Sequence, residues 1–134
     1  MIFKIKDFIV ITDKKIEQLN EQYLKPSEIK NDKASGLRWE YKLREFNAFI
    51  DFYYIKNKII SDIFEFIEFI ELLKAFSSKK LEHNTEYKIN RIVSARIVQK
   101  DRIYSLQITF HNQKIYLSYF ECSSLAAKLS KVLQ

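Results

Sequence analysis

Several stretches of this 134-residue chain alternate apolar and polar residues, which is the pattern of strands with one buried face. The clearest is residues 37–44, LRWEYKLR, in which every second side chain is apolar. Residues 104–110 alternate in the same way from Tyr104 to Phe110. Other runs are rich in β-branched and aromatic residues, which also favours strands. Together these patterns predict strands at residues 2–12, 37–44, 46–55, 58–60, 87–100, 104–110 and 115–117.

Apolar residues recur every three or four positions in other stretches, and this spacing is typical of amphipathic helices. The three predicted helices are residues 13–24, 62–76 and 119–133. The apolar stripe of the last one consists of Phe120, Leu125, Leu129 and Val132. The helix of residues 62–76 is apolar around most of its circumference, so we expect it to pack on more than one side. Residues 25–36, which contain the only Pro and the only Gly, predict a loop.

The two halves of the chain end in a similar way. The motif KIISDIFE, which begins at Lys58, is matched 56 residues later by KIYLSYFE, which begins at Lys114. Each motif holds an Asp or Ser followed three positions later by Glu, the capping-box pattern of a helix start. We therefore predict an α+β fold in one domain, residues 1–134. Its half-repeats, residues 1–76 and 77–134, are each an antiparallel strand meander closed by a C-terminal amphipathic helix. The alternative is chance similarity, since strand–cap–helix sequences are common.

The two helix-ending stretches, KIISDIFEFIEFIELLKAF and KIYLSYFECSSLAAKLSKVL, give the chain a resemblance to known families. A strand meander that ends in a capped amphipathic helix, twice in tandem, resembles the Whirly and PUR (purine-rich-element-binding) families of single-stranded nucleic-acid-binding proteins. The resemblance is one of pattern and covers residues 37–76 and 87–133. It implies two sheets packed by their helices, with bases lying on exposed aromatic side chains of the sheets.

Composition excludes several classes of protein. The hydrophobic fraction of 47% excludes intrinsic disorder for most of the chain. A single cysteine, Cys122, excludes a disulfide scaffold, and with two histidines it offers too few ligands for a Cys/His zinc site. One glycine excludes a Gly-x-Gly phosphate loop. The most apolar run, residues 59–76, is interrupted by charges, so we expect no membrane insertion and a cytoplasmic location.

The net charge of +6 comes from one half of the chain. Residues 1–76 hold 13 Lys or Arg and 13 Asp or Glu, whereas residues 77–134 hold 10 and 4. Concentrated positive charge attracts a polyanion such as nucleic acid, an anionic membrane surface or an acidic protein. The alternative is that these side chains only keep the protein soluble.

Basic and aromatic residues are interleaved within the predicted strands. Single-strand binding requires this combination, because cations neutralise phosphates and flat rings stack on bases. Tyr116 is expected to be exposed, since Ile115 and Leu117 occupy the opposite face of their strand. For Trp39 the alternative is a place in the core. The predicted nucleic-acid-binding residues are Trp39, Lys42, Lys88, Arg91, Arg96, Lys100, Arg102, Lys114 and Tyr116.

We therefore expect a protein that binds single-stranded DNA or RNA, without catalysis, cofactor or metal. The pattern Glu40-x-Lys42 resembles part of a nuclease metal site, but a cross-strand charge pair is the simpler interpretation. The alternative function is a small protein-interaction module, such as an inhibitor, an immunity-type protein or an assembly subunit. We expect a protein partner or a homodimer to bind through the helix of residues 62–76, because its apolar surface exceeds what one small core requires.

Overall fold

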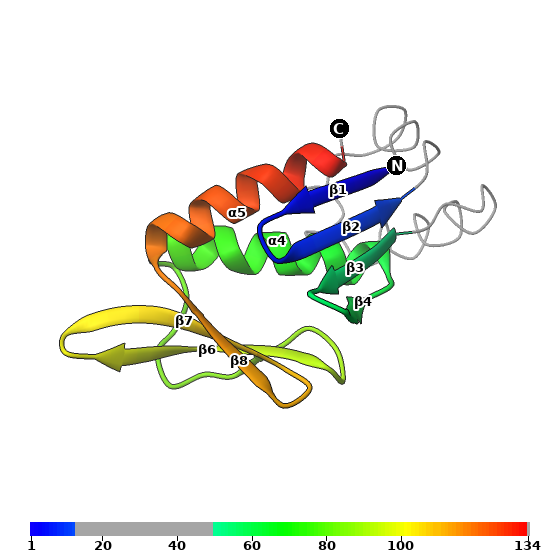
Figure 1. Ribbon diagram of the computed structural model, residues 1–134. Coiled ribbons are helices and arrows are strands. Elements are labelled where there is room, and N and C mark those ends of the chain that lie inside the picture. The colour runs from blue at the N-terminus through cyan, green and yellow to red at the C-terminus, as the bar shows by residue number, and fades with distance from the viewer. Residues whose placement is uncertain (13–49, 134) are drawn as a thin grey trace, which may run out of the picture.

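The computed structural model describes residues 1–12 and 50–133 and shows two antiparallel sheets and two helices packed together (Figure 1). The predicted α+β class is confirmed. Each sheet has four strands in sequential order and is followed by one helix, so the same arrangement occurs twice. The helix, loop and strand predicted within residues 13–44 lie outside the described residues, as do Trp39 and Lys42.

The first sheet contains a turn that the sequence analysis did not predict. Its strands are β1 (Ile2–Ile5), β2 (Phe8–Thr12), β3 (Ile50–Tyr54) and β4 (Asn57–Ile60). The prediction of one continuous strand across residues 2–12 is wrong, because Lys6 and Asp7 form a turn and Ile5 pairs with Phe8. Both Ile5 and Phe8 face the core. Two residues three positions apart in a single strand would face opposite sides, so the shifted alternation marks the turn.

The helix α4 (Ile63–Ser77) begins at the predicted cap. The Asp62 carboxylate accepts hydrogen bonds from the backbone N–H groups of Phe64 and Glu65, at 2.8 and 3.1 Å. The Glu65 carboxylate, expected to complete a capping box, accepts instead from Asn90 at 3.2 Å. The apolar side chains that α4 buries are Phe66, Ile67, Phe69, Ile70, Leu72, Leu73 and Phe76.

The second sheet begins with a short strand rather than a long one. Its strands are β5 (Tyr87–Lys88), β6 (Val93–Lys100), β7 (Ile103–Phe110) and β8 (Gln113–Leu117). The prediction of one continuous strand across residues 87–100 is wrong, because a turn at Ile89–Ile92 interrupts it. The Asn90 side chain forms this turn, since its Oδ1 accepts from the backbone N–H groups of Ile92 and Val93 at 2.8 and 2.7 Å.

The helix α5 (Tyr119–Val132) begins with a complete capping box, as predicted. Ser118 Oγ accepts from the Glu121 N–H, and Glu121 Oε1 accepts from the Ser118 N–H, both at 3.1 Å. The placement of Phe120 on the buried stripe is wrong, because its side chain is 81% exposed. Phe120 lies two residues before the buried Cys122, which is about 200° around a helix. The buried residues of α5 are Cys122, Leu125, Ala126, Leu129 and Val132.

The two helices pack against each other, with the sheets on one side of the pair (Figure 1). Phe52 of β3 meets Phe66 of α4 at a centroid distance of 5.3 Å, and Phe76 of α4 stacks on Tyr119 at 4.6 Å. The apolar faces of α4 therefore pack within the chain, on its own sheet and on α5. Neither of the two described helices is long and apolar enough to span a membrane.

Candidate nucleic-acid interface

The second sheet presents one face to the helices and the other away from them. Inward-pointing residues such as Ala95, Leu106 and Ile108 are buried. The residues between them point the other way, because successive side chains of a strand alternate. We call this second surface the outer face. It consists of Lys88, Ser94, Arg96, Val98, Lys100, Ile103, Ser105, Gln107, Thr109, Lys114 and Tyr116.

A row across three strands of the outer face joins a cation, an amide and an aromatic ring. Arg96 of β6 lies opposite Gln107 of β7, which lies opposite Tyr116 of β8. Gln107 Nε2 donates a hydrogen bond to Tyr116 Oη at 3.1 Å. The Tyr116 side chain is 56% exposed, which confirms the expectation from its neighbours. The hydrogen bond holds the phenol ring in one orientation, so little side-chain freedom is lost when a flat ligand stacks on it.

The neighbouring row adds two lysines. Lys88 of β5 lies opposite Ser94, and Thr109 lies opposite Lys114 of β8. Ser94 and Thr109 are themselves paired, so Lys88 and Lys114 stand at the two ends of one row. We call the row of Arg96, Gln107 and Tyr116 the tyrosine row. The neighbouring row thus places an ammonium group beside it at each edge of the sheet.

No carboxylate within β5–β8 offsets these cations. The four strands contain no Asp or Glu, and Asp101 lies in the turn between β6 and β7. The corresponding face of the first sheet differs, because Asp51 there forms an ion pair with Lys58 at 3.9 Å. More uncompensated positive charge therefore lies on the second sheet, which favours the attraction of a polyanion there.

The structure brings together part of the predicted set. Lys88, Arg96, Lys114 and Tyr116 lie on two adjacent rows of the outer face. Lys100 is on the same face near the far end of β6, where it pairs with Ile103.

The remaining predicted residues within the described ranges lie in turns. Arg102 lies in the turn between β6 and β7, with a positive φ of 66°. Arg91 lies elsewhere, in the turn between β5 and β6, beside Lys58 and Glu65. The described structure therefore does not join Arg91 to the tyrosine row.

The sequence analysis missed two surface residues, the half-buried Gln107 and the exposed Phe120. Gln107 was treated only as a polar member of an alternating strand, because its contact with Tyr116 depends on strand register. Phe120 was assigned to the core, although its angular distance from Leu125 and Leu129 around the helix already separates it from them. Helical-wheel angles would have found Phe120, whereas no sequence signal reveals the partner of Gln107.

The described residues include neither a thiolate nor a cluster of metal ligands. Cys122 is fully buried, and burial, with the nearby Glu121 carboxylate, raises the pKa of its thiol to about 12. It is a core residue, and it is not a thiolate at neutral pH. Within residues 1–12 and 50–133, no three His, Cys, Asp or Glu side chains lie close enough to hold a metal ion.

Comparisons of the chain with protein-family models, with curated proteins and with solved structures find no match. The function must therefore be inferred from the geometry and charge of the described residues.

Proposed function

We propose that the protein binds single-stranded nucleic acid on the outer face of the second sheet, without catalysing a reaction on it. The observation that carries the proposal is the row of Arg96, Gln107 and Tyr116, in which an exposed, hydrogen-bonded ring shares one row with a cation. A base stacked on an aromatic side chain contributes roughly 1–3 kcal/mol to binding. Each phosphate neutralised by Lys or Arg adds a salt-dependent contribution.

The exposed ring favours a single strand over a duplex. Bases within a duplex are stacked on one another and offer only their edges in the grooves. An aromatic side chain on an open sheet can stack only on a base whose face is free, as in an unpaired strand. DNA and RNA both meet this requirement.

The repeated order of four strands and one helix supports the proposed resemblance to the Whirly and PUR families. That resemblance implies bases on exposed sheet aromatics, which agrees with the exposure of Tyr116. A cytoplasmic location is part of this proposal.

The alternative, a protein-interaction module, rested on the excess apolar surface of α4. That surface packs on β3 and α5, so it no longer calls for a partner. A homodimer through α4 stays a prediction, and an elution volume that shifts with protein concentration is its test.

The proposal is tested by fluorescence anisotropy with a labelled oligonucleotide of mixed sequence. In a variant that carries Arg96→Glu and Lys114→Glu, each change removes an attraction and adds a repulsion. We expect binding at about 50 mM salt to weaken more than tenfold. The slope of log K against log salt should fall by about 0.7 for each phosphate that the variant no longer neutralises.

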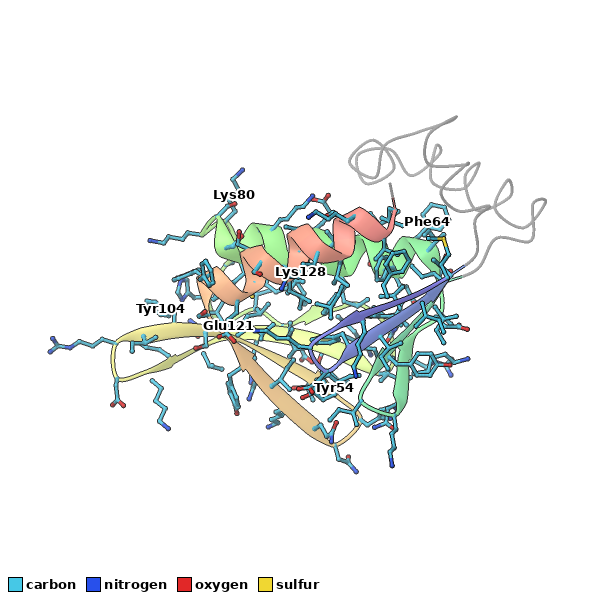
Figure 2. The ribbon with its side chains drawn as sticks, turned by 45° about the horizontal axis from the view of Figure 1, so that its top comes forward. Tyr54, Phe64, Lys80, Tyr104, Glu121 and Lys128 are labelled. Carbon is cyan, nitrogen blue, oxygen red and sulfur yellow. The ribbon has the colours of Figure 1, made fainter. Side chains whose placement is uncertain are left out.

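The matched control carries Lys80→Glu and Lys131→Glu, which change the net charge equally. Both lysines are exposed, and Figure 2 shows Lys80 just beyond the end of α4, pointing away from the strands. We expect the affinity of the control to fall by less than about threefold, since only long-range attraction is reduced. Equal losses in the two variants would show diffuse charge attraction without a site. No binding by the unaltered protein at this salt concentration would favour the interaction module.

A further inference from the structure

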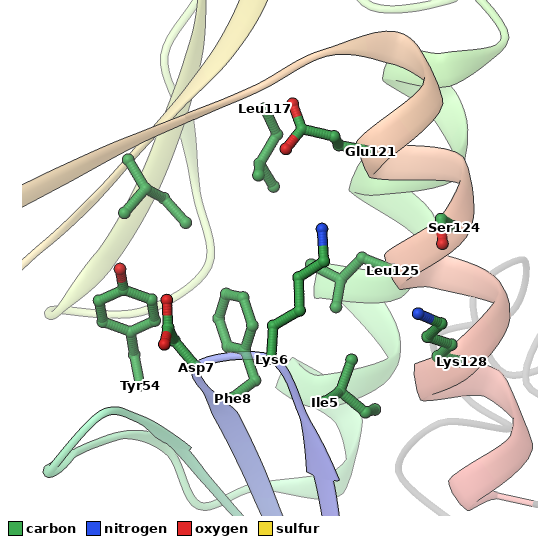
Figure 3. Close-up of a pocket in the computed structure, with 11 residues that line it drawn as sticks. Ile5, Lys6, Asp7, Phe8, Tyr54, Leu117, Glu121, Ser124, Leu125 and Lys128 are labelled. Atoms are coloured by element: carbon green, nitrogen blue, oxygen red, sulfur yellow. The ribbon is translucent and has the colours of Figure 1, made fainter.

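A cavity of about 150 Å³ lies where the two halves of the chain meet (Figure 3). It is bounded by the turn between β1 and β2, by Tyr54 at the end of β3, by β8 and by α5. A cavity of about this volume holds one six-membered aromatic ring, as binding of benzene to an engineered cavity demonstrates. Its apolar lining comes from Ile5, Phe8, Ile115, Leu117 and Leu125, and polar or charged side chains complete the lining.

Two ammonium groups converge on one side of this cavity. Lys6 comes from the turn of the first sheet and Lys128 from α5, and Figure 3 shows their Nζ atoms on either side of Leu125. Among the residues that the structure describes, neither lysine forms an ion pair. The Glu121 carboxylate nearby already accepts from the Ser118 N–H in the capping box. Two unpaired ammonium groups beside an apolar pocket suit the phosphate of a ligand whose ring lies inside.

A carboxylate marks the other side of the cavity. Asp7 and Tyr54 lie across the Phe8 ring from Lys6 (Figure 3). An ionised carboxylate only accepts hydrogen bonds, so it favours a ring that carries an amino group. Cytosine presents an N4 amino donor at the position where uracil and thymine present the O4 acceptor.

We propose that this junction cavity binds one cytidine nucleotide. The base lies between the apolar walls with N4 toward Asp7, and the phosphate lies between Lys6 and Lys128. The volume fits one six-membered ring, and Asp7 selects cytosine over uracil or thymine. The site is separate from the outer face, because Leu117 points to the inner side of β8 and Tyr116 to the outer side. Free CMP and a cytosine within a strand share this chemistry, so the test includes both.

The first arm of the test is titration of the whole protein with CMP, followed by NMR or calorimetry. We expect CMP to bind about tenfold more tightly than UMP, GMP, cytidine or inorganic phosphate. Lys128→Ala should lower CMP affinity severalfold, while Lys131→Ala on the same helix should leave it unchanged. Asp7→Asn should reduce the preference for CMP over UMP to near one, because an amide both donates and accepts.

The second arm identifies the source of the nucleotide. If a strand supplies it, a C-rich oligonucleotide should bind more tightly than a T-rich one, and Asp7→Asn should abolish that preference. If the free nucleotide is the ligand, CMP binds but the two oligonucleotides bind equally. The variant with Arg96→Glu and Lys114→Glu should keep CMP binding in both cases, which separates this inference from the function proposed for the outer face.

Two results would overturn the inference. One is CMP binding no tighter than that of UMP or inorganic phosphate, together with equal binding of C-rich and T-rich oligonucleotides. The other is CMP binding that Lys128→Ala and Asp7→Asn leave unchanged. Thermal melts of both variants exclude unfolding as the cause of a weaker affinity, and Lys128 is exposed on a helix, where alanine is well tolerated.

Discussion

Asn90 Nδ2 donates a hydrogen bond to Glu65 Oε2 at 3.2 Å, and this bond joins the turn between β5 and β6 to the first turn of α4. The same nitrogen donates to the carbonyl oxygen of Ile59 at 3.0 Å. On its other side, Asn90 Oδ1 accepts from the two backbone N–H groups that open β6. One side chain thus forms a turn in the second half of the chain and fixes the end of β4 in the first.

Replacing Asn90 by alanine should destabilise the fold strongly. The change removes four hydrogen bonds, each worth about 0.5–1.5 kcal/mol net, so we expect the free energy of unfolding to fall by about 2–6 kcal/mol. Urea denaturation followed by circular dichroism measures the change. Gln99→Ala, at an exposed position of β6, is the control and should cost less than about 0.5 kcal/mol. Similar losses of stability in both variants would contradict a junction role for Asn90.

The burial of Glu65, which accepts this hydrogen bond, makes stability depend on pH. Burial raises the pKa of the Glu65 carboxyl above its usual value of 4.5, and the charge of Asp62 raises it further, against the hydrogen bond from Asn90. Because the folded pKa exceeds the unfolded one, folding favours the neutral acid. This contribution is fully present below pH 4.5 and is lost as the pH rises through the folded pKa.

Glu65→Gln removes this titration and keeps an oxygen that accepts from Asn90. We expect the variant to gain stability relative to the unaltered protein as the pH rises from about 4 to about 7. Free energies of unfolding from urea titrations at both pH values measure the gain. The control is Glu86→Gln, at an exposed carboxylate. Its difference in stability from the unaltered protein should be the same at both pH values. A difference for Glu65→Gln that does not change with pH would refute the assignment.

The turn between β3 and β4 holds a β-branched residue in the left-handed region, since Ile55 has a φ of 56°. This conformation costs an ordinary residue roughly 1–2 kcal/mol, and asparagine adopts it more readily. The Ile55 side chain is 49% exposed, so little burial is lost on substitution. We expect Ile55→Asn to stabilise the fold by about 1 kcal/mol and to raise Tm by a few degrees. Ile103→Asn, at an exposed isoleucine in an extended strand, should instead lower Tm.

Alternation and capping predicted the elements whose cause is local. Residues 104–110 of β7 alternate, and the cap residues Asp62 and Ser118 stand directly before their helices. The turn at Lys6 was missed because glycine is the usual signal of a residue in the left-handed region. This chain has one glycine and places other residues, such as Lys6, in that region. The φ of 51° at Lys6 follows from the pairing of β1 with β2, and the residue carries no turn signature.

In the candidate site, too, the features with a local cause were predictable and those that depend on distant contacts were not. The exposure of Tyr116 follows from its neighbours in one strand, so the sequence predicted it. The contact of Gln107 with Tyr116 and the position of Lys6 and Lys128 at one cavity depend on register and packing between distant segments. No local pattern encodes these contacts.

The buried position of Cys122 predicts an unreactive thiol. With a pKa of about 12, only about one molecule in ten thousand carries the thiolate at pH 8. We expect Ellman's reagent to react with the native protein only through unfolding, and at once in concentrated guanidinium chloride. The control is a variant with Cys122→Ala and Ser123→Cys, whose exposed thiol should react rapidly without denaturant. Rapid reaction of the unaltered native protein would show that the core opens around α5.

The hydrogen bond from Gln107 predicts a graded series at Tyr116. Under the proposed function, Tyr116→Ala removes the stacking ring and should weaken single-strand binding about tenfold or more. Tyr116→Phe keeps the ring and removes only its anchor, so it should cost about threefold, and Gln107→Ala should cost the same. Combining Tyr116→Phe with Gln107→Ala should weaken binding no further, because both changes remove the same hydrogen bond.

Anisotropy titrations at fixed salt measure all four variants. The control is Tyr53→Ala, which removes a ring from the outward side of the first sheet and should change little. Equal effects of Tyr116→Phe and Tyr116→Ala would mean that the hydroxyl, and not the ring, contacts the nucleic acid.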